Sequence, residues 1–131
     1  MKIGVYGGSF NPPHLGHVRA AQACKRALGL DRVLVIPASI PPHKQMASGS
    51  ATAMERLRLT QLAFSQLPGF EVLDMELRRE GKSYTVDTIR ALKEQYKQGE
   101  MYLMMGTDMF LSFQDWYCPE EIAKNARLVC F

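Results

Sequence analysis

Short apolar runs alternate with longer amphipathic stretches from one end of the chain to the other. Apolar runs predict strands at 2–6, 32–36, 70–73, 101–105 and 128–131. Apolar residues at helical spacing predict helices at 15–28, 54–67 and 85–97, with shorter helices at 109–113 and after Pro119. The run at 32–36 is almost wholly apolar, as in a parallel strand covered on both faces. This order of elements predicts an α/β fold: a doubly wound parallel sheet in three α/β/α layers.

Individual residues mark where the helices are expected to begin and end. Gly29 is placed to stop the helix at 15–28, and Pro119 suits the first turn of a helix. Ser83 is expected to cap the helix that starts at Thr85, and Gly99 to terminate it.

Length and composition set the class of protein. The chain has 131 residues, of which 47% are hydrophobic and 22% charged, so a single domain over 1–131 is expected. Cys24, Cys118 and Cys130 form no CxxC pair and are expected to be reduced thiols. No apolar stretch approaches the ~20 residues of a membrane span, and no signal peptide is visible, which predicts a cytoplasmic protein with no membrane partner. The basic residues do not cluster, so no nucleic-acid partner is expected.

Polar residues follow the ends of three predicted strands, at Gly7-Gly8, at Pro37 and at Gly106. In open α/β sheets, ligands bind at the carboxyl ends of the strands, where the strand order reverses. The segment from Gly7 to His17 reads GGSFNPPHLGH and matches neither of the two common phosphate-binding loops. Its paired glycines nevertheless allow close approach of a ligand, and the helix that follows offers N–H groups to an anion. We therefore expect a nucleotide site here.

His14 and His17 lie three residues apart at the start of the first helix. Residues at this spacing share a helix face, so both imidazoles can point at one phosphate group, and Gly16 leaves room beside them. In one alternative, one histidine caps the helix and the other packs. In a second, the pair binds a metal, although no third ligand with clear spacing accompanies it. We therefore name no metal-ligating residue.

Several motifs along the chain resemble those of nicotinate mononucleotide adenylyltransferases, within the HxGH nucleotidylyltransferase superfamily. The string GSFNPPHLGH at 8–17 carries most of the resemblance. Further matches are PASIPPHK at 37–44, YTVDT at 84–88, and GTD at 106–108 followed by Trp116. The resemblance implies a Rossmann-like nucleotidylyltransferase fold. It also implies adenylyl transfer from ATP to nicotinate mononucleotide, giving deamido-NAD and pyrophosphate in NAD biosynthesis.

The resemblance also implies roles for individual residues. His14 and His17 would be catalytic. The ATP-binding residues would be Gly7, Gly8, Ser9, Phe10, His14, Gly16, His17, Gly106 and Asp108. The mononucleotide-binding residues would be Asn11, His43, Lys44, Tyr84, Thr85 and Trp116. Mg²⁺ is expected to arrive with ATP.

Simpler roles for some of these residues stay open. Thr85 and Asp108 could be helix caps, and Trp116 could be a core residue. His43 and Lys44 could be solvated loop charges.

The family's C-terminal motif, which resembles SST-x-(I/V)R, is absent after Cys118, and the chain ends at Phe131 within a predicted strand. The expectation is a fold that is incomplete at the C-terminus, with the ATP-binding segment missing and poor turnover. The alternatives are an adenylyltransferase acting on nicotinamide mononucleotide or pantetheine phosphate, and an inactive nucleotide-binding fragment. The oligomeric state stays open, and a homo-oligomer is compatible with the sequence.

Overall fold

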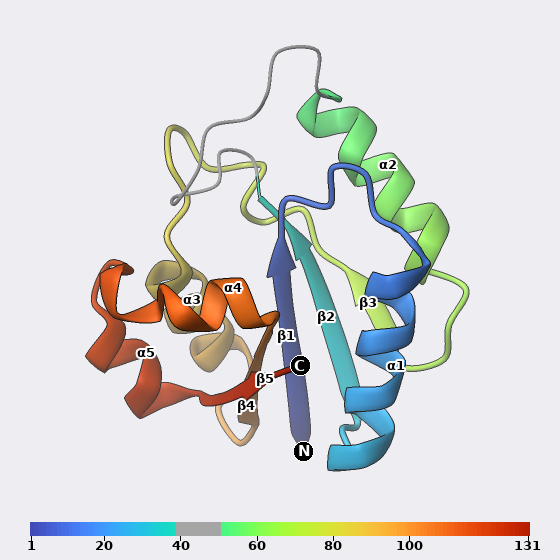
Figure 1. The fold of residues 1–131 in the computed structure, drawn as a ribbon. Coiled ribbons are helices and arrows are strands. Elements are labelled where there is room, and N and C mark those ends of the chain that lie inside the picture. The colour runs from blue at the N-terminus through green and yellow to red at the C-terminus, as the bar shows by residue number, and fades with distance from the viewer. Residues whose placement is uncertain (39–50) are drawn as a thin grey trace.

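The computed structural model describes residues 1–38 and 51–131 (Figure 1). Its strands form one parallel sheet in the order β3-β2-β1-β4-β5. The strands are β1 (Lys2–Gly8), β2 (Arg32–Pro37), β3 (Phe70–Val72), β4 (Glu100–Met105) and β5 (Arg127–Cys130). The helices are α1 (Leu15–Leu28), α2 (Ala53–Phe64), α3 (Thr85–Gln95), α4 (Thr107–Leu111) and α5 (Pro119–Asn125), with a 3₁₀ turn η1 (Phe113–Asp115). The predicted parallel α/β fold is confirmed.

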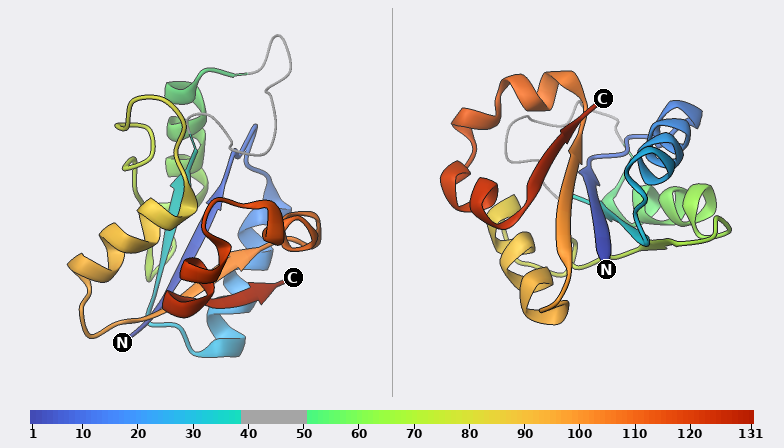
Figure 2. Two further views of the ribbon diagram at one scale, coloured as in Figure 1. Left: turned by 90° about the vertical axis from the view of Figure 1, so that its left-hand side faces the viewer. Right: turned by 90° about the horizontal axis from the view of Figure 1, so that it is seen from below.

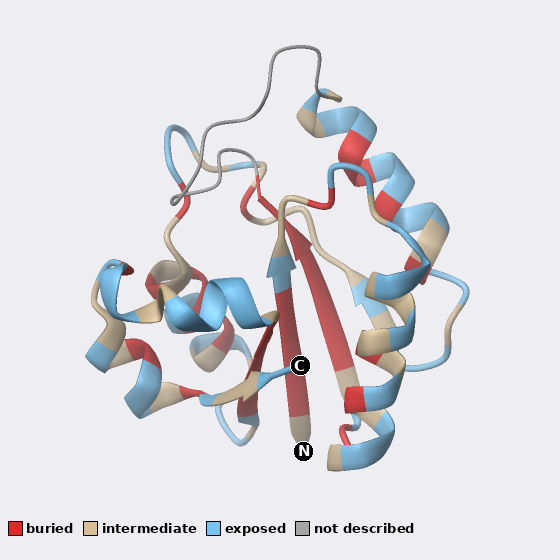
Figure 3. Ribbon diagram, viewed as in Figure 1, coloured by how far each residue is buried: buried red, intermediate tan, exposed pale blue. Residues whose placement is uncertain are grey.

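Helices cover both faces of the sheet, with α1 and α2 on one side and α3 and α5 on the other (Figure 2). Successive residues of a strand point to opposite faces, so neighbours in β1 enter different cores. Val5 packs with the α3 and α5 side, whereas Tyr6 packs with the α1 and α2 side. The central strands β1, β2 and β4 are largely buried, the edge strands β3 and β5 are only partly covered, and the outer faces of the helices are exposed (Figure 3). This is the three-layer arrangement that the sequence predicts. No helix in the described part of the chain is both long and apolar enough to cross a membrane.

The strand order reverses at β1, and this reversal decides where a ligand can bind. From β1 the chain moves outward through β2 to β3, and it then returns to place β4 on the other side of β1. The helix that follows β1 packs on one face, while α4, which follows β4, lies on the other (Figure 1). The loops at the carboxyl ends of β1 and β4 therefore diverge and leave a crevice between them.

The helix signals read from the sequence are partly right. Gly29 ends α1 in the left-handed conformation at φ 63°, and Pro119 opens α5, as predicted. The expected role of Ser83 is wrong, because Tyr84 is the N-cap of α3 and the Ser83 hydroxyl donates to the Glu76 carbonyl at 2.9 Å. The expected role of Gly99 is also wrong, since α3 ends at Gln95 with Tyr96 as its cap.

Candidate functional site

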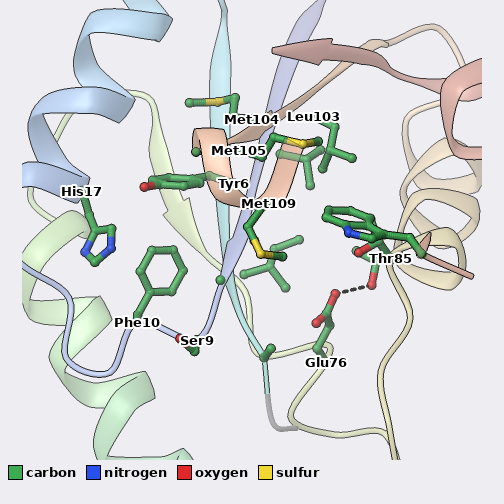
Figure 4. Close-up of a pocket in the computed structure, with 18 of the residues that line it drawn as sticks. Tyr6, Ser9, Phe10, His17, Glu76, Thr85, Leu103, Met104, Met105 and Met109 are labelled. Atoms are coloured by element: carbon green, nitrogen blue, oxygen red, sulfur yellow. Dashed lines mark hydrogen bonds between the residues drawn. The ribbon is translucent and has the colours of Figure 1, made fainter. Parts of the chain in front are cut away.

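A cavity of about 460 Å³ opens at the carboxyl ends of β1 and β4, where the strand order reverses. Figure 4 shows His17 and Phe10 on one side of it and Thr85 and Glu76 on the other. Nine of the residues selected from the sequence line it: Gly7, Gly8, Ser9, Phe10, His17, Thr85, Gly106, Asp108 and Trp116. Four others, Asn11, His14, Gly16 and Tyr84, are not part of the lining. His43 and Lys44 lie outside the described residues.

The two histidines build the start of α1 together. His14 is the N-cap, and its Nδ1 accepts a hydrogen bond from the Gly16 N–H at 3.1 Å. His17 reaches back, and its Nδ1 accepts from the His14 N–H at 3.0 Å. The two rings stack, with centroids 3.8 Å apart and planes 24° from parallel. This is a capping box in which imidazoles take the places usually held by a hydroxyl and a carboxylate.

These hydrogen bonds determine which nitrogen of each ring carries the proton. A nitrogen that accepts a backbone N–H bond has no proton of its own, so the neutral ring holds its proton on Nε2. Neither Nε2 atom has a hydrogen-bond partner within residues 1–38 and 51–131. Each imidazole therefore turns an N–H donor away from the backbone, and the His17 ring lines the cavity.

Gly16 is required by the position of the His14 ring. A Cβ atom at Gly16 would lie 2.9 Å from both Cε1 and Nδ1 of His14, closer than such atoms approach in proteins. Any side chain here would displace the ring that caps the helix. The glycine of the HxGH motif thus permits the stacked pair.

Burial keeps the His17 imidazole in its neutral form. The ring is half-buried and lies edge-to-face against Phe10, with centroids 5.2 Å apart. Burial lowers the pKa of His17, and the neighbouring His14 lowers it further. At neutral pH the cavity therefore receives a neutral N–H donor from this ring.

The turn between β1 and α1 is held by Phe10. This residue adopts the left-handed conformation at φ 45°, which is uncommon for a residue with a side chain. Its ring is buried and meets those of Tyr6 and Phe64 edge-on. The packing of the ring compensates the backbone strain and directs the Gly8–Ser9 backbone towards the cavity.

Arg56 of α2 is a positioning residue that the sequence analysis did not select for the site. Its side chain is 2% exposed, and its Nη1 donates to the carbonyls of Ser9 at 2.7 Å and Ala38 at 2.6 Å. These two carbonyls follow the ends of β1 and β2, so a single guanidinium ties both loops together. An arginine inside the helical run beside Leu57 was the available signal.

The α3 side of the cavity contains Glu76 and Thr88, which the sequence analysis also missed. The Thr88 hydroxyl donates to Glu76 Oε2 at 2.6 Å and accepts from Arg79 Nη1 at 2.8 Å. Burial raises the pKa of Glu76, while the Thr88 hydrogen bond and the Arg79 charge oppose this rise. The signal for Thr88 was its place one helical turn after Thr85.

The simpler roles of three predicted site residues can be compared with their positions. Thr85 is the first residue of α3 and not its cap, and Asp108 lies inside α4, whose N-cap is Gly106. Trp116 is indeed a core residue, 7% exposed, and its Nε1 donates to the Ser112 hydroxyl at 3.3 Å. It also lines the cavity, so the core position does not remove its indole from the site.

Metal-ligating side chains do not gather in the part of the chain that the structure describes. No group of three histidine, cysteine, aspartate or glutamate residues has the geometry of a metal site there.

Comparison with known proteins identifies the family. Residues 5–131 match the family model described as cytidylyltransferase-like. The chain belongs to this family. It is 46% identical to a probable nicotinate-nucleotide adenylyltransferase of Geobacter sulfurreducens, over 98% of this chain and 59% of that one. It is 40% identical to the Listeria monocytogenes protein of the same name, over 98% of this chain and 68% of that one. The resemblance predicted from the motifs is confirmed.

Solved structures show the same fold. A putative nicotinate-nucleotide adenylyltransferase from Vibrio parahaemolyticus aligns with a TM-score of 0.79 at 24% identity, over 98% of this chain and 72% of that one. The Plasmodium falciparum nicotinic acid mononucleotide adenylyltransferase complexed with NaAD aligns with a TM-score of 0.83 at 16% identity, over 98% of this chain and 63% of that one. The chain spans about three fifths of the length of the Geobacter relative. The expected Rossmann-like nucleotidylyltransferase fold is confirmed.

Proposed function

We propose that the protein transfers the adenylyl group of ATP to nicotinate mononucleotide, giving deamido-NAD and pyrophosphate in NAD biosynthesis. The observation that carries this proposal is the stacked histidine pair at the start of α1, in which the His17 ring lines the cavity where the sheet order reverses and the His14 ring stacks on it. The names of the relatives support the choice of nicotinate mononucleotide as acceptor.

The reaction needs positioned donors and no protein nucleophile. A phosphate oxygen of the mononucleotide attacks the α-phosphorus of ATP and forms the new P–O bond. The bond from the α-phosphorus to the bridging oxygen breaks, and its electron pair leaves with pyrophosphate. Catalysis therefore consists of aligning two anions and stabilising the charge on the leaving group.

The cavity offers one side to each substrate. On the His17 side, the imidazole Nε2 atoms and the glycine-rich backbone would donate to the ATP phosphates, and Asp108 would accept from ribose hydroxyls. On the Thr85 side, the first N–H groups of α3 would receive the nicotinate carboxylate. The Trp116 indole would stack on the pyridine ring. The remaining residues proposed for the ATP side are Gly7, Gly8, Ser9, Phe10, His14, Gly16 and Gly106. Those proposed for the mononucleotide side are Asn11, His43, Lys44 and Tyr84.

The ATP substrate is its magnesium complex. Mg²⁺ binds phosphate oxygens and water readily and needs few protein ligands, which agrees with the sparse carboxylates of the described cavity. When bound, the ion neutralises charge on the departing pyrophosphate.

The test is product formation from MgATP with three acceptors: nicotinate mononucleotide, nicotinamide mononucleotide and pantetheine phosphate. Chromatography of the dinucleotide and a coupled pyrophosphate assay give the rates. We expect the nicotinate compound to be preferred, and His17→Ala to reduce kcat by about 100-fold. Gln98→Ala, at an exposed position away from the cavity, is the control. Preference for another acceptor, or an unchanged rate in His17→Ala, would refute the proposal.

A further inference from the structure

The α3 side of the cavity contains a buried charge that adenylyl transfer does not require. Glu76 is 7% exposed and lines the cavity, and Figure 4 shows its carboxylate near the start of α3, on the same side as Thr85. An acidic group beside the proposed position of an anionic substrate group opposes binding.

Hydrogen bonds hold this carboxylate in one place. Its Oε2 accepts from the Thr88 hydroxyl at 2.6 Å, and the Ser83 hydroxyl donates to the Glu76 backbone carbonyl at 2.9 Å. Both the side chain and the main chain of Glu76 are thereby tied to the residues that begin α3. Glu76 is a positioning residue for this wall of the cavity.

Arg79 supplies the opposing charge. Its Nη1 donates to Thr88 Oγ1 at 2.8 Å, so one hydroxyl links the guanidinium to the carboxylate. Burial raises the pKa of Glu76, and the Thr88 hydrogen bond and the Arg79 charge both oppose this rise. The carboxylate is buried, so these charges are screened less than they would be in water.

The start of α3 is itself attractive to anions. Its N-cap, Tyr84, makes no side-chain hydrogen bond to the first turn, whereas α1 and α2 both begin with capping boxes. Uncapped N–H groups and the helix dipole favour a negative group here. The helix start and Arg79 make the local potential more positive, and Glu76 makes it more negative. Asp87, in the first turn of α3, adds a further negative charge that is paired with Arg90 at 3.1 Å.

We propose that Glu76 and Arg79 set the preference of this site between an anionic and a neutral pyridine substituent. This inference rests on the proposed function. Arg79 offsets the Glu76 charge, so the helix start remains attractive to a carboxylate. Glu76 holds that helix start in position and limits the preference for the acid. The ratio of affinities for nicotinate and nicotinamide mononucleotides is therefore determined by this pair.

The test measures dissociation constants of the two mononucleotides by fluorescence of Trp116, the only tryptophan of the sequence. For Arg79→Gln we expect the acid-to-amide preference to fall about fivefold, and for Glu76→Gln to rise about fivefold. Thr88→Val removes hydrogen bonds without a charge, so it should weaken both ligands alike. Arg79→Lys retains the positive charge and should retain the preference.

Matched controls separate local charge from net charge. Arg78→Gln removes the same charge as Arg79→Gln, but from a side chain that is 78% exposed and paired with Asp74 at 3.0 Å. Glu80→Gln removes the same charge as Glu76→Gln, but from an exposed carboxylate. Neither should alter the preference. Thermal melting of each variant verifies folding, and if Arg79→Gln fails to fold, Glu76→Gln and Arg79→Lys decide the question.

Opposite shifts of the ratio in Glu76→Gln and Arg79→Gln support the inference. An unchanged ratio in both, or a parallel loss of affinity for both ligands, overturns it and leaves the proposed function intact. Failure of the wild-type protein to bind either mononucleotide overturns the proposed function and this inference together.

Discussion

Substituting Gly16 by alanine separates the two tasks of the histidine pair, which are to cap a helix and to present donors. The new methyl group would lie 2.9 Å from Cε1 and Nδ1 of the His14 ring, so the ring must move. Its movement breaks the 3.1 Å hydrogen bond from the Gly16 N–H and the 3.8 Å stack on His17. The backbone at Gly16 itself accepts alanine, because its φ lies outside the left-handed region.

The expected changes in stability and in activity have different sizes. Loss of the cap costs about 1 kcal/mol, and replacement of a helical glycine by alanine returns about the same amount. The net free energy of unfolding should therefore change by less than about 1 kcal/mol. A catalytic group displaced by about 1 Å can lower the rate on the order of 100-fold, so kcat/KM for ATP should fall about 10- to 100-fold.

Urea unfolding and steady-state kinetics on the same preparation test both parts. Gly29→Ala is the matched control, because Gly29 ends the same helix at φ 63° with nothing within 4 Å of an added Cβ. That variant should lose about 1 kcal/mol of stability and keep its kcat/KM. The reasoning fails if Gly16→Ala keeps kcat/KM within twofold of wild type, or if its lost activity is matched by an equal loss in Gly29→Ala.

Three further predictions follow from the described contacts. Arg56→Met should lower the free energy of unfolding by about 3 kcal/mol in urea titrations, since the buried Ala38 carbonyl and the partly buried Ser9 carbonyl lose their donor. Because folding holds the pKa of His17 below its ordinary 6.5, the unfolded chain binds more protons, and stability should fall as pH drops through 6.5. Urea midpoints at pH 5.5 and 7.5 would show this fall in wild type and a smaller one in His17→Gln. Trp116→Leu should raise KM for nicotinate mononucleotide about tenfold and leave KM for ATP unchanged, and a parallel rise in both would contradict stacking.

Local patterns in the sequence predicted most of the helices and strands, and they predicted the side of the site formed by the glycine-rich loop after β1. The bounds of α1 are those expected, because a capping histidine and Gly29 define both ends within a few residues. The strand order could not be read from the chain, because the pairing of β1 with β4 depends on contacts nearly one hundred residues apart. The predicted residues of the glycine-rich loop reach the cavity because they directly follow β1.

The residues that the sequence analysis missed, and Ser83, whose role it assigned wrongly, share one physical property: their partners are distant in the sequence or lie across a turn. In the sequence, Arg56 cannot be told apart from an exposed charge on a helix. In the fold, the sheet brings the Ser9 and Ala38 carbonyls within hydrogen-bond distance of its guanidinium. In the sequence, Ser83 has the position of a helix cap. In the fold, the turn before α3 brings the Glu76 carbonyl to 2.9 Å from the Ser83 hydroxyl, which donates to it. A pattern of residue types cannot show such contacts, because each depends on where the folded backbone places a carbonyl group.

Histidine is suited to the start of α1 because it has two nitrogens on opposite sides of one rigid ring. An aspartate at position 14 would accept the Gly16 N–H equally well, but it would place a negative charge where phosphates are expected to bind. A serine would also cap the helix, but its O–H donor is on the same atom that accepts from the backbone, so no rigid ring would carry that donor away from the helix. In His14 and His17, Nδ1 accepts from the backbone and thereby fixes the proton on Nε2, which faces away from the helix. The interaction that stabilises the helix start thus also sets the orientation and protonation of the groups proposed to bind the nucleotide.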